Sequence, residues 1–233
     1  MSNQKNNFTS EWNNYYSNDK NSDIPPPNEV VNFLSQFILN ESHNQTNNEI
    51  VIPAKRVIDV GCGRGANLLL GDNMGIEMYG VDISEKAVEI SMAALEEEIG
   101  SLAHDRLLVS DIGQLPWTDC FFTGAISTNT LDSMTFKSAQ AGLPEIARVT
   151  KEGGYFFCSL ISGDSLENST NFCGEELVQN GSHTQTVISY FNRTKVRRLI
   201  EPLFEILSCD LHEVSNPKID SKTSQWNIIA KRR

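Results

Sequence analysis

The sequence predicts one α/β domain with additional elements at its ends. The chain has 233 residues, of which 39% are hydrophobic and 21% charged, and this composition suits a single globular domain with a sizeable core. An apolar run at residues 57–60 is too short for a helix and stops at closely spaced glycines, as a buried parallel strand does at a tight turn. Two further apolar runs, at residues 76–81 and 107–110, are each followed by an acidic residue. Apolar residues at helical spacing come after the first of these two runs. These three observations favour parallel strands joined by helices.

The N-terminal part of the chain predicts a separate segment. Residues 1–10 are polar and lack periodicity, so we expect them to be disordered or loosely attached. The aromatic residues Trp12, Tyr15 and Tyr16 follow in a polar context, and they cap either the core or a ligand. After three prolines, Asn28 is a candidate N-cap for a helix whose apolar face packs on the sheet. We therefore divide the chain into residues 1–40, a polar segment and first helix that act as a lid, and residues 41–233, the main domain.

The segment KRVIDVGCGRG at residues 55–65 organises the rest of the chain. Three glycines at alternate positions allow the backbone to bend sharply and to approach a ligand closely, namely Gly61, Gly63 and Gly65. Asp59 stands two residues before the first of them. Cys62 lies within the turn, but no histidine is near enough in sequence to activate it, so we interpret it as a packing residue. A helix at residues 66–70, which Gly71 interrupts, then points its N-terminus at the ligand.

Acidic residues also follow the second and third strands. Asp82 ends the strand at residues 76–81, where its two oxygens can accept hydrogen bonds from both hydroxyls of a ribose. Ser84 is the predicted N-cap of the helix at residues 85–99, which leaves Asp82 for the ligand. Asp111 follows the strand at residues 107–110, and a fourth strand at residues 120–127 leads to Thr128.

This D-x-G-x-G-x-G turn with acids at the ends of three strands resembles the class I methyltransferases that use S-adenosylmethionine. The resemblance implies a seven-stranded doubly wound sheet, mostly parallel with an antiparallel last strand, and helices on both faces. It also implies that the glycine turn wraps the methionine end of the cofactor, while Asp59 helps to hold the turn and the ammonium group. It places the adenine at Asp111. The implied cofactor residues are Asp59, Gly61, Cys62, Gly63, Asp82, Ile83, Asp111, Ile112, Ser127 and Thr128.

The second half of the domain follows the same family pattern. A helix that begins with Pro144 runs into the double glycine at residues 153–154, which resembles the turn before the family's fifth strand, here residues 155–161. Residues 162–192 have no clear period and are interpreted as an insertion. A helix at residues 194–201 precedes two strands, at 204–214 and 224–231, which form an antiparallel pair. This ending fits the family's reversed seventh strand.

The sequence identifies no definite catalytic residue. Methyl transfer from a sulfonium is an in-line displacement, so alignment and exclusion of water are the main requirements and a base is optional. Of the four histidines, His183 in the insertion is the best placed to reach a substrate, and weaker candidates are Asp132, Tyr15, Tyr16 and Tyr190. Ser133 stands where many small-molecule members carry a histidine, so we expect no base there. The segment STNT at residues 127–130 differs from the motif of DNA amino methyltransferases, which counts against DNA as the substrate.

Composition excludes several other classes. The net charge of −11 and the pI near 4.8 argue against a nucleic-acid partner, since that binding depends on Lys and Arg. Five cysteines without a C-x-x-C pair or a histidine at metal-binding spacing predict no metal site. Neither a signal peptide nor a membrane span is recognisable, and we expect a cytoplasmic protein with reduced thiols.

The resulting hypothesis is a methyltransferase that acts on a small-molecule acceptor with S-adenosylmethionine as donor. Two alternatives stay open. A nicotinamide-dependent oxidoreductase would use the G-x-G-x-x-A pattern that ends at Ala66, with Asp82 on the ribose, but it assigns no purpose to Asp59 or Asp111. The second alternative is a domain that binds the cofactor but catalyses no reaction. The identity of the acceptor, the atom methylated and the oligomeric state are not predicted.

Overall fold

The computed structural model describes residues 2–18, 25–40, 55–165, 172–180, 184–216 and 221–233. Its centre is a seven-stranded sheet with the strand order β3-β2-β1-β4-β5-β9-β8. The strands are β1 (Arg56–Val60), β2 (Glu77–Asp82), β3 (Leu107–Val109), β4 (Phe122–Thr128), β5 (Thr150–Ile161), β8 (Phe204–Asn216) and β9 (Ser221–Arg232). Pairing from β3 through β5 is parallel, whereas β9 runs antiparallel to both β5 and β8. The predicted α/β class and the reversed last strand are confirmed.

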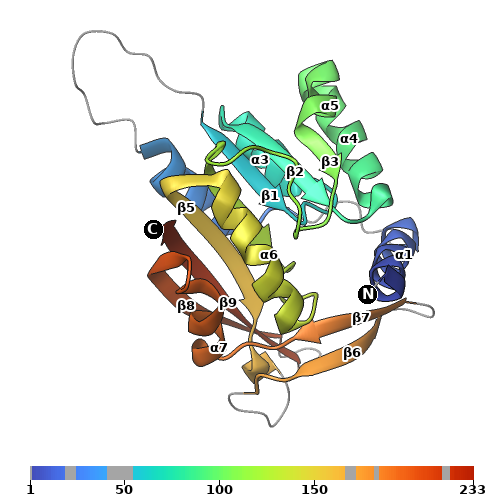
Figure 1. The fold of residues 1–233 in the computed structure, drawn as a ribbon, viewed down its shortest axis with the longest axis vertical. Coiled ribbons are helices and arrows are strands. Elements are labelled where there is room, and N and C mark those ends of the chain that lie inside the picture. Colours follow the sequence, from blue (N-terminus) through green and yellow to red (C-terminus); the bar gives the residue numbers. More distant parts are fainter. Residues whose placement is uncertain (1, 19–24, 41–54, 166–171, 181–183, 217–220) are drawn as a thin grey trace.

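Two hydrophobic cores cover the two faces of the sheet (Figure 1). The first contains Leu143 and Ile146 of α6 (Phe136–Val149) together with Leu199 of α7 (Arg193–Ile200). The second is formed by the helices α2 (Asn28–Phe33), α3 (Ala66–Asn73) and α4 (Glu85–Ile99) and by the π-helix η1 (Leu34–Leu39). Shorter helical elements are η3 (Gly100–Leu102), α5 (Ala103–Arg106) and η4 (Gly163–Ser165). The predicted arrangement of helices on both faces is therefore confirmed.

The N-terminal segment differs from the expectation. Residues 2–18 form the helix α1 (Ser2–Asn18), so the expected disorder of residues 1–10 is wrong for the part described. The helix has no strong apolar periodicity of its own, and its contacts with α4 and with the strand β7 (Thr184–Ser189) supply the stabilisation that the sequence pattern did not show. The helix at residue 28 is confirmed, but Pro27 is its N-cap and Asn28 is its first residue. Residues 41–54, expected to be a polar connection, lie outside the described residues.

The boundaries of two helices were also predicted wrongly. The helix α3 continues through Gly71. A glycine is needed at this position because a Cβ would lie 2.3 Å from Met78 Sδ. The helix α6 begins eight residues before Pro144, with Thr135 as its N-cap. Pro144 is tolerated inside the helix because it and Gln140, whose carbonyl loses its N–H partner, are both exposed to water. Within the insertion, β6 (Glu175–Asn180) and β7 pair as an antiparallel hairpin.

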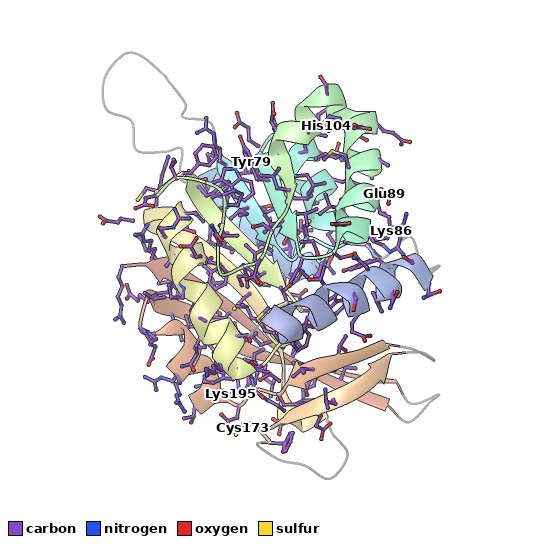
Figure 2. All side chains as sticks on the ribbon, turned by 45° about the vertical axis from the view of Figure 1, so that its right-hand side comes forward. Tyr79, Lys86, Glu89, His104, Cys173 and Lys195 are labelled. Atoms are coloured by element: carbon purple, nitrogen blue, oxygen red, sulfur yellow. The ribbon has the colours of Figure 1, made fainter. Side chains whose placement is uncertain are left out.

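The hairpin is attached to the segment after β4, to the start of α6 and to α7. Ser189 N donates to Asp132 O over 2.7 Å, and Phe136 N at the start of α6 donates to Glu175 Oε1 over 2.5 Å. Lys195 of α7 donates from Nζ to Cys173 O, Ser189 Oγ and Tyr190 O, each within 2.9 Å. Figure 2 shows Lys195 and Cys173 next to each other at the base of the hairpin. The hairpin is thereby fixed beside α1, which crosses between it and α4 (Figure 2).

Candidate active site

A cavity of about 740 Å³ lies at the carboxyl ends of the parallel strands, a volume within the range of roughly 300–1,000 Å³ that is typical of small-molecule sites. Its floor is formed by residues that follow β1, β2 and β4 and by the segment after β3, and α1 and the start of α6 contribute its walls. Eight of the ten predicted cofactor residues line this cavity: Gly61, Cys62, Gly63, Asp82, Ile83, Asp111, Ile112 and Thr128. The other two, Asp59 and Ser127, are fully buried beneath it.

The glycine turn after β1 adopts a conformation that other residues rarely adopt. Gly61, Gly63 and Gly65 have φ angles of +77°, +53° and +84°. A Cβ on Gly61 would lie 2.1 Å from Thr130 Oγ1, and one on Gly63 would lie 2.8 Å from Tyr16 Oη. The turn is also fixed to the next strand, since Gly61 N and Cys62 N both donate to Val81 O, over 2.8 and 3.0 Å. The backbone can therefore approach a ligand closely at this edge of the sheet.

Asp82 is the central acid of the cavity. Its Oδ2 accepts from Gly63 N over 3.0 Å and its Oδ1 from Ser84 N over 2.9 Å, and the residue is only 7% exposed. Burial raises the pKa of this carboxyl, while the backbone N–H donors at Ser84 and Gly63 oppose the rise. Each carboxylate oxygen can accept more than one hydrogen bond. Asp82 thus holds the glycine turn in place and retains acceptor capacity toward the cavity.

The segment after β3 forms an end of the cavity suited to a flat ring. Asp111 Oδ1 accepts from Gly113 N over 2.7 Å, which fixes the start of this turn. Ile112 packs closely against the backbone of Gly142 in α6, where an added Cβ would lie 2.9 Å from the isoleucine side chain. The absence of a side chain at Gly142 therefore lets Ile112 pack directly against α6. Ile83 lines the cavity as well.

Asp59 lies under the glycine turn, where burial raises its pKa to about 7. Its Oδ2 accepts from Asn67 Nδ2 over 3.2 Å, and the same amide donates to Thr128 Oγ1 over 3.3 Å. Among the described residues, Asp59 Oδ1 and Asn67 Oδ1 are buried acceptors without a hydrogen-bond partner. Two adjacent acceptors of this kind fit a ligand that brings N–H donors, such as an ammonium group. Asn67 also lines a second cavity, which adjoins the first at Cys62, Thr128 and Tyr16.

The helix α1 covers the open side of the cavity. Phe8, Trp12, Tyr15 and Tyr16 all line it, so these aromatic residues face the ligand space. Asn13 attaches the helix, because its Oδ1 accepts from Ser84 Oγ over 2.7 Å and from Lys86 N over 3.2 Å. Figure 2 shows Lys86 at the start of α4, beside α1. Burial, followed by the negative charge of Asp82, raises the pKa of the Tyr16 phenol well above its usual range, so Tyr16 keeps its proton.

The candidate catalytic residues are less favourably placed. Asp132 is 4% exposed, does not line the cavity, and accepts from Ile161 N over 2.6 Å, so it joins the segment after β4 to β5. Burial raises its pKa to about 6. Tyr190 is buried and does not line the cavity either, whereas Tyr16 does. His183 lies outside the described residues. Ser133 donates to Asn129 O over 2.7 Å and borders the cavity.

Several lining residues were not predicted from the sequence. Phe8 belongs to a helix without a clear periodic pattern, and its position depends on the attachment of that helix to Ser84 through Asn13. Met134 and Ala141 stand in the loop before α6 and within that helix, whose start was placed too late. The sequence does contain a signal for this start of α6, because Thr135 is a preferred N-cap residue and its side chain accepts from Ser138 N.

A family model described as a methyltransferase domain matches residues 58–158. The chain contains a methyltransferase domain. The match covers the strands β1 to β4, most of β5 and the glycine turn, the parts that line the floor of the cavity. Together with the sheet order, the match supports the predicted class I methyltransferase fold. Curated proteins gave no match to the sequence.

Solved structures share the fold of the methyltransferase domain at low identity. An S-adenosylmethionine-dependent methyltransferase from Methanosarcina mazei has a TM-score of 0.65 at 20% identity, over 76% of this chain and 92% of its own. A protein from Pyrococcus horikoshii OT3 has a TM-score of 0.64 at 16% identity, over 94% and 99%. The 1,6-didemethyltoxoflavin-N1-methyltransferase of Burkholderia thailandensis, solved with its substrate and S-adenosylhomocysteine, has a TM-score of 0.64 at 16% identity, over 98% and 87%.

None of the helices in the described ranges combines the length and apolarity needed to span a bilayer. Nowhere in the part of the chain that the structure describes do three His, Cys, Asp or Glu residues gather in a metal-binding cluster.

Proposed function

We propose that this protein transfers the methyl group of S-adenosylmethionine to a small-molecule acceptor. The observation that carries the proposal is that the glycine turn, Asp82 and Asp111, which follow three neighbouring strands, line one cavity of about 740 Å³. A lining of this kind offers separate contacts for the methionine, ribose and adenine parts of the donor. The residues fit the donor, since the glycines admit it and the buried acceptors beside Asp59 lack donors.

Each predicted cofactor residue then has a role. Asp82 accepts from the ribose hydroxyls, Asp111 accepts from the exocyclic amine of adenine, and Ile83 and Ile112 enclose the ring. Gly61, Cys62 and Gly63 wrap the methionine part, and Asp59 accepts from its ammonium group. Ser127 and Thr128 offer backbone groups beside the same part. Asn67 is added to the set because its free Oδ1 is adjacent to Asp59.

Residues 1–40 act as a lid in this proposal, and residues 41–233 form the catalytic domain. The aromatic residues of α1 line the cavity, which supports a role in closing over the ligands and excluding water. The insertion at 162–192 supports the lid from below, since β7 contacts α1. A net charge of −11 and a cavity of this size favour a small molecule over a nucleic acid as the acceptor. We also propose that the enzyme works in the cytoplasm.

Binding and turnover measurements test the proposal against both alternatives. Calorimetry should detect S-adenosylmethionine and S-adenosylhomocysteine, but not NAD. The reversed strand β9 and the family match already disfavour a nicotinamide-dependent oxidoreductase. Incubation of the protein with donor and a pool of metabolites should release S-adenosylhomocysteine. Donor binding without any release would instead support a domain that binds the cofactor and does not turn it over.

A further inference from the structure

One part of the cavity is lined by residues to which the proposed function assigns no contact with the donor. It is lined by Phe8 and Trp12 of α1 and by Thr130, Ser133 and Met134 from the segment between β4 and α6. We call these five residues the acceptor compartment. Two aromatic rings and a thioether form apolar walls, and hydroxyl groups are the polar contributions. Walls of this composition favour a ring-shaped molecule, which can stack on aromatic faces and contact the sulfur atom.

The cavity carries no positive charge among the described residues. Neither Lys nor Arg lines it, and Arg64 lines only the second cavity. The titratable groups that do line it are Tyr15, Tyr16, Cys62, Asp82 and Asp111. An acidic acceptor would therefore lose its hydration without gaining a cationic partner from the described lining, and it would approach two carboxylates. This disfavours carboxylates and phosphates as acceptors.

The described lining also contains no suitable base. Asp82 and Asp111 are committed to the backbone and, under the proposed function, to the donor. Burial raises the pKa of the Cys62 thiol, and the Tyr16 phenol keeps its proton. His104 and His212 pair with Glu96 and Glu29 away from the cavity. A hydroxyl acceptor would need a base near neutral pH, whereas a neutral nitrogen already presents its lone pair.

We propose that the acceptor is an uncharged ring compound that presents a neutral nitrogen, as an aromatic amine or an N-heterocycle. This inference rests on the proposed function. The nitrogen lone pair forms a bond to the methyl carbon while the bond between that carbon and sulfur breaks. Its electron pair stays on sulfur, which becomes the neutral thioether of S-adenosylhomocysteine. The nitrogen gains the positive charge, which the rings of Phe8 and Trp12 and the acidic lining stabilise, and it can then release a proton to water.

A matched series of probes tests this inference, namely 2-aminonaphthalene, 2-naphthol and 2-naphthoate, which differ only in the substituent. Calorimetry on the full chain saturated with S-adenosylhomocysteine should show at least about tenfold tighter binding of the amine and the naphthol than of the naphthoate, as expected for one unpaired charge. With S-adenosylmethionine, mass spectrometry should find the methylated amine, at a rate that does not change between pH 7 and 9, and no methylated naphthol.

Four outcomes would overturn the inference. They are equal or tighter binding of naphthoate, methylation of naphthol at a rate that rises with pH, binding of the amine without transfer, and no binding of any probe to a protein that binds S-adenosylhomocysteine. Failure to bind S-adenosylhomocysteine would instead remove the proposed function. The two results are therefore distinguishable.

A charge introduced into the acceptor compartment provides the matched control. Met134→Lys should shift the preference toward naphthoate by roughly tenfold, because it supplies the missing cation. Gln140→Lys adds the same charge at an exposed position of α6 that does not line the cavity, and it should retain the preference of the unmodified protein. If thermal melting shows that Met134→Lys does not fold, Ser133→Lys at the neighbouring position provides the same test. An unchanged preference in folded Met134→Lys or Ser133→Lys would mean that the probes bind elsewhere.

Discussion

The donor side of the cavity is held by backbone geometry, whereas the acceptor compartment is held by side chains from segments far apart in the sequence. On the donor side, the glycine turn donates to Val81 O and to Asp82 Oδ2, and Ser91 Oγ donates to Gly63 O over 2.5 Å. On the acceptor side, α1 is attached through Asn13, and Asn129 accepts from Gln225 of β9. The two sides meet at Thr130, whose Oγ1 donates to Gly61 O over 3.5 Å, and elsewhere they are held by different bonds.

This comparison predicts that the largest loss follows a change in the glycine turn. Gly61→Ala places a Cβ 2.1 Å from Thr130 Oγ1 at a φ of +77°, so the turn must move. We expect donor affinity to fall by roughly a hundredfold or more, as binding calorimetry with S-adenosylhomocysteine would show. Gly75→Ala is the matched control, since its φ is +78° but nothing lies within 4 Å of the added Cβ. It should cost only about 1 kcal/mol of stability from backbone strain and leave donor affinity unchanged. Equal donor affinities in the two variants would contradict the role of the turn.

The next largest effect is expected at Asp82. Asp82→Ala removes the acceptor for Gly63 N and Ser84 N as well as the contact proposed for the ribose. Loss of charge-assisted bonds of this kind should weaken donor binding by more than about tenfold, measured by calorimetry. Glu89→Ala is the control, because this acid on α4 pairs with Lys86 at the surface (Figure 2) and does not line the cavity. An unchanged affinity in Asp82→Ala would remove Asp82 from the site.

The donor side could be predicted from the sequence because it depends on local patterns. A strand that ends at an acid and a glycine turn has its conformation determined within a few residues, and parallel pairing then brings Asp82 and Asp111 to the same edge. Ser84 was likewise predicted from local sequence to be an N-cap. Its side chain accepts from Ala87 N, which confirms the prediction. The complete burial of Asp59 could not be predicted, since it depends on how α3 packs over β1.

Apart from Trp12, which was expected to cap the core or a ligand, the acceptor compartment could not be predicted, for the opposite reason. The helix α1 has few apolar positions of its own, and its structure depends on contacts with α4 and β7. The hairpin β6–β7 depends on Asp132, Phe136 and Lys195, which are remote from it in sequence. Such contacts leave no periodic signal. Sequence reasoning therefore identified the donor and left the acceptor unnamed.

Burial of Asp59 predicts a conflict between stability and donor binding. The pKa of Asp59 is about 7 in the folded protein, whereas its value without burial, as in the unfolded chain, is 3.8. The folded state therefore binds the proton more tightly. The stability from this group is complete below pH 3.8 and is lost as the pH rises through 7. Asp59→Asn should therefore raise the free energy of unfolding at pH 7.5 by up to about 4 kcal/mol and flatten its dependence on pH, measured by urea denaturation. Donor affinity should fall at the same time, because the ammonium group loses a charged partner.

A second buried carboxyl separates these two effects. Asp132 has a pKa raised to about 6 by burial and does not line the cavity. Asp132→Asn should raise stability at neutral pH in the same direction, while donor affinity stays unchanged in calorimetry. A fall in donor affinity equal to that of Asp59→Asn would show that the loss comes from general repacking and not from contact with the ammonium group.

The smallest effect is expected at the attachment of α1. Asn13→Ala removes the acceptor for Ser84 Oγ and Lys86 N, two hydrogen bonds worth about 1 kcal/mol each. The donor side keeps its own bonds, so donor affinity should change by no more than about threefold. The helix should open more often, and we expect faster proteolysis within residues 2–18 and faster hydrogen exchange there, with a melting temperature lower by a few degrees. Asn14→Ala, at an exposed neighbouring position, should leave both rates unaltered. A large loss of donor affinity in Asn13→Ala would mean that α1 belongs to the donor side, and the two halves of the cavity would then act as one unit.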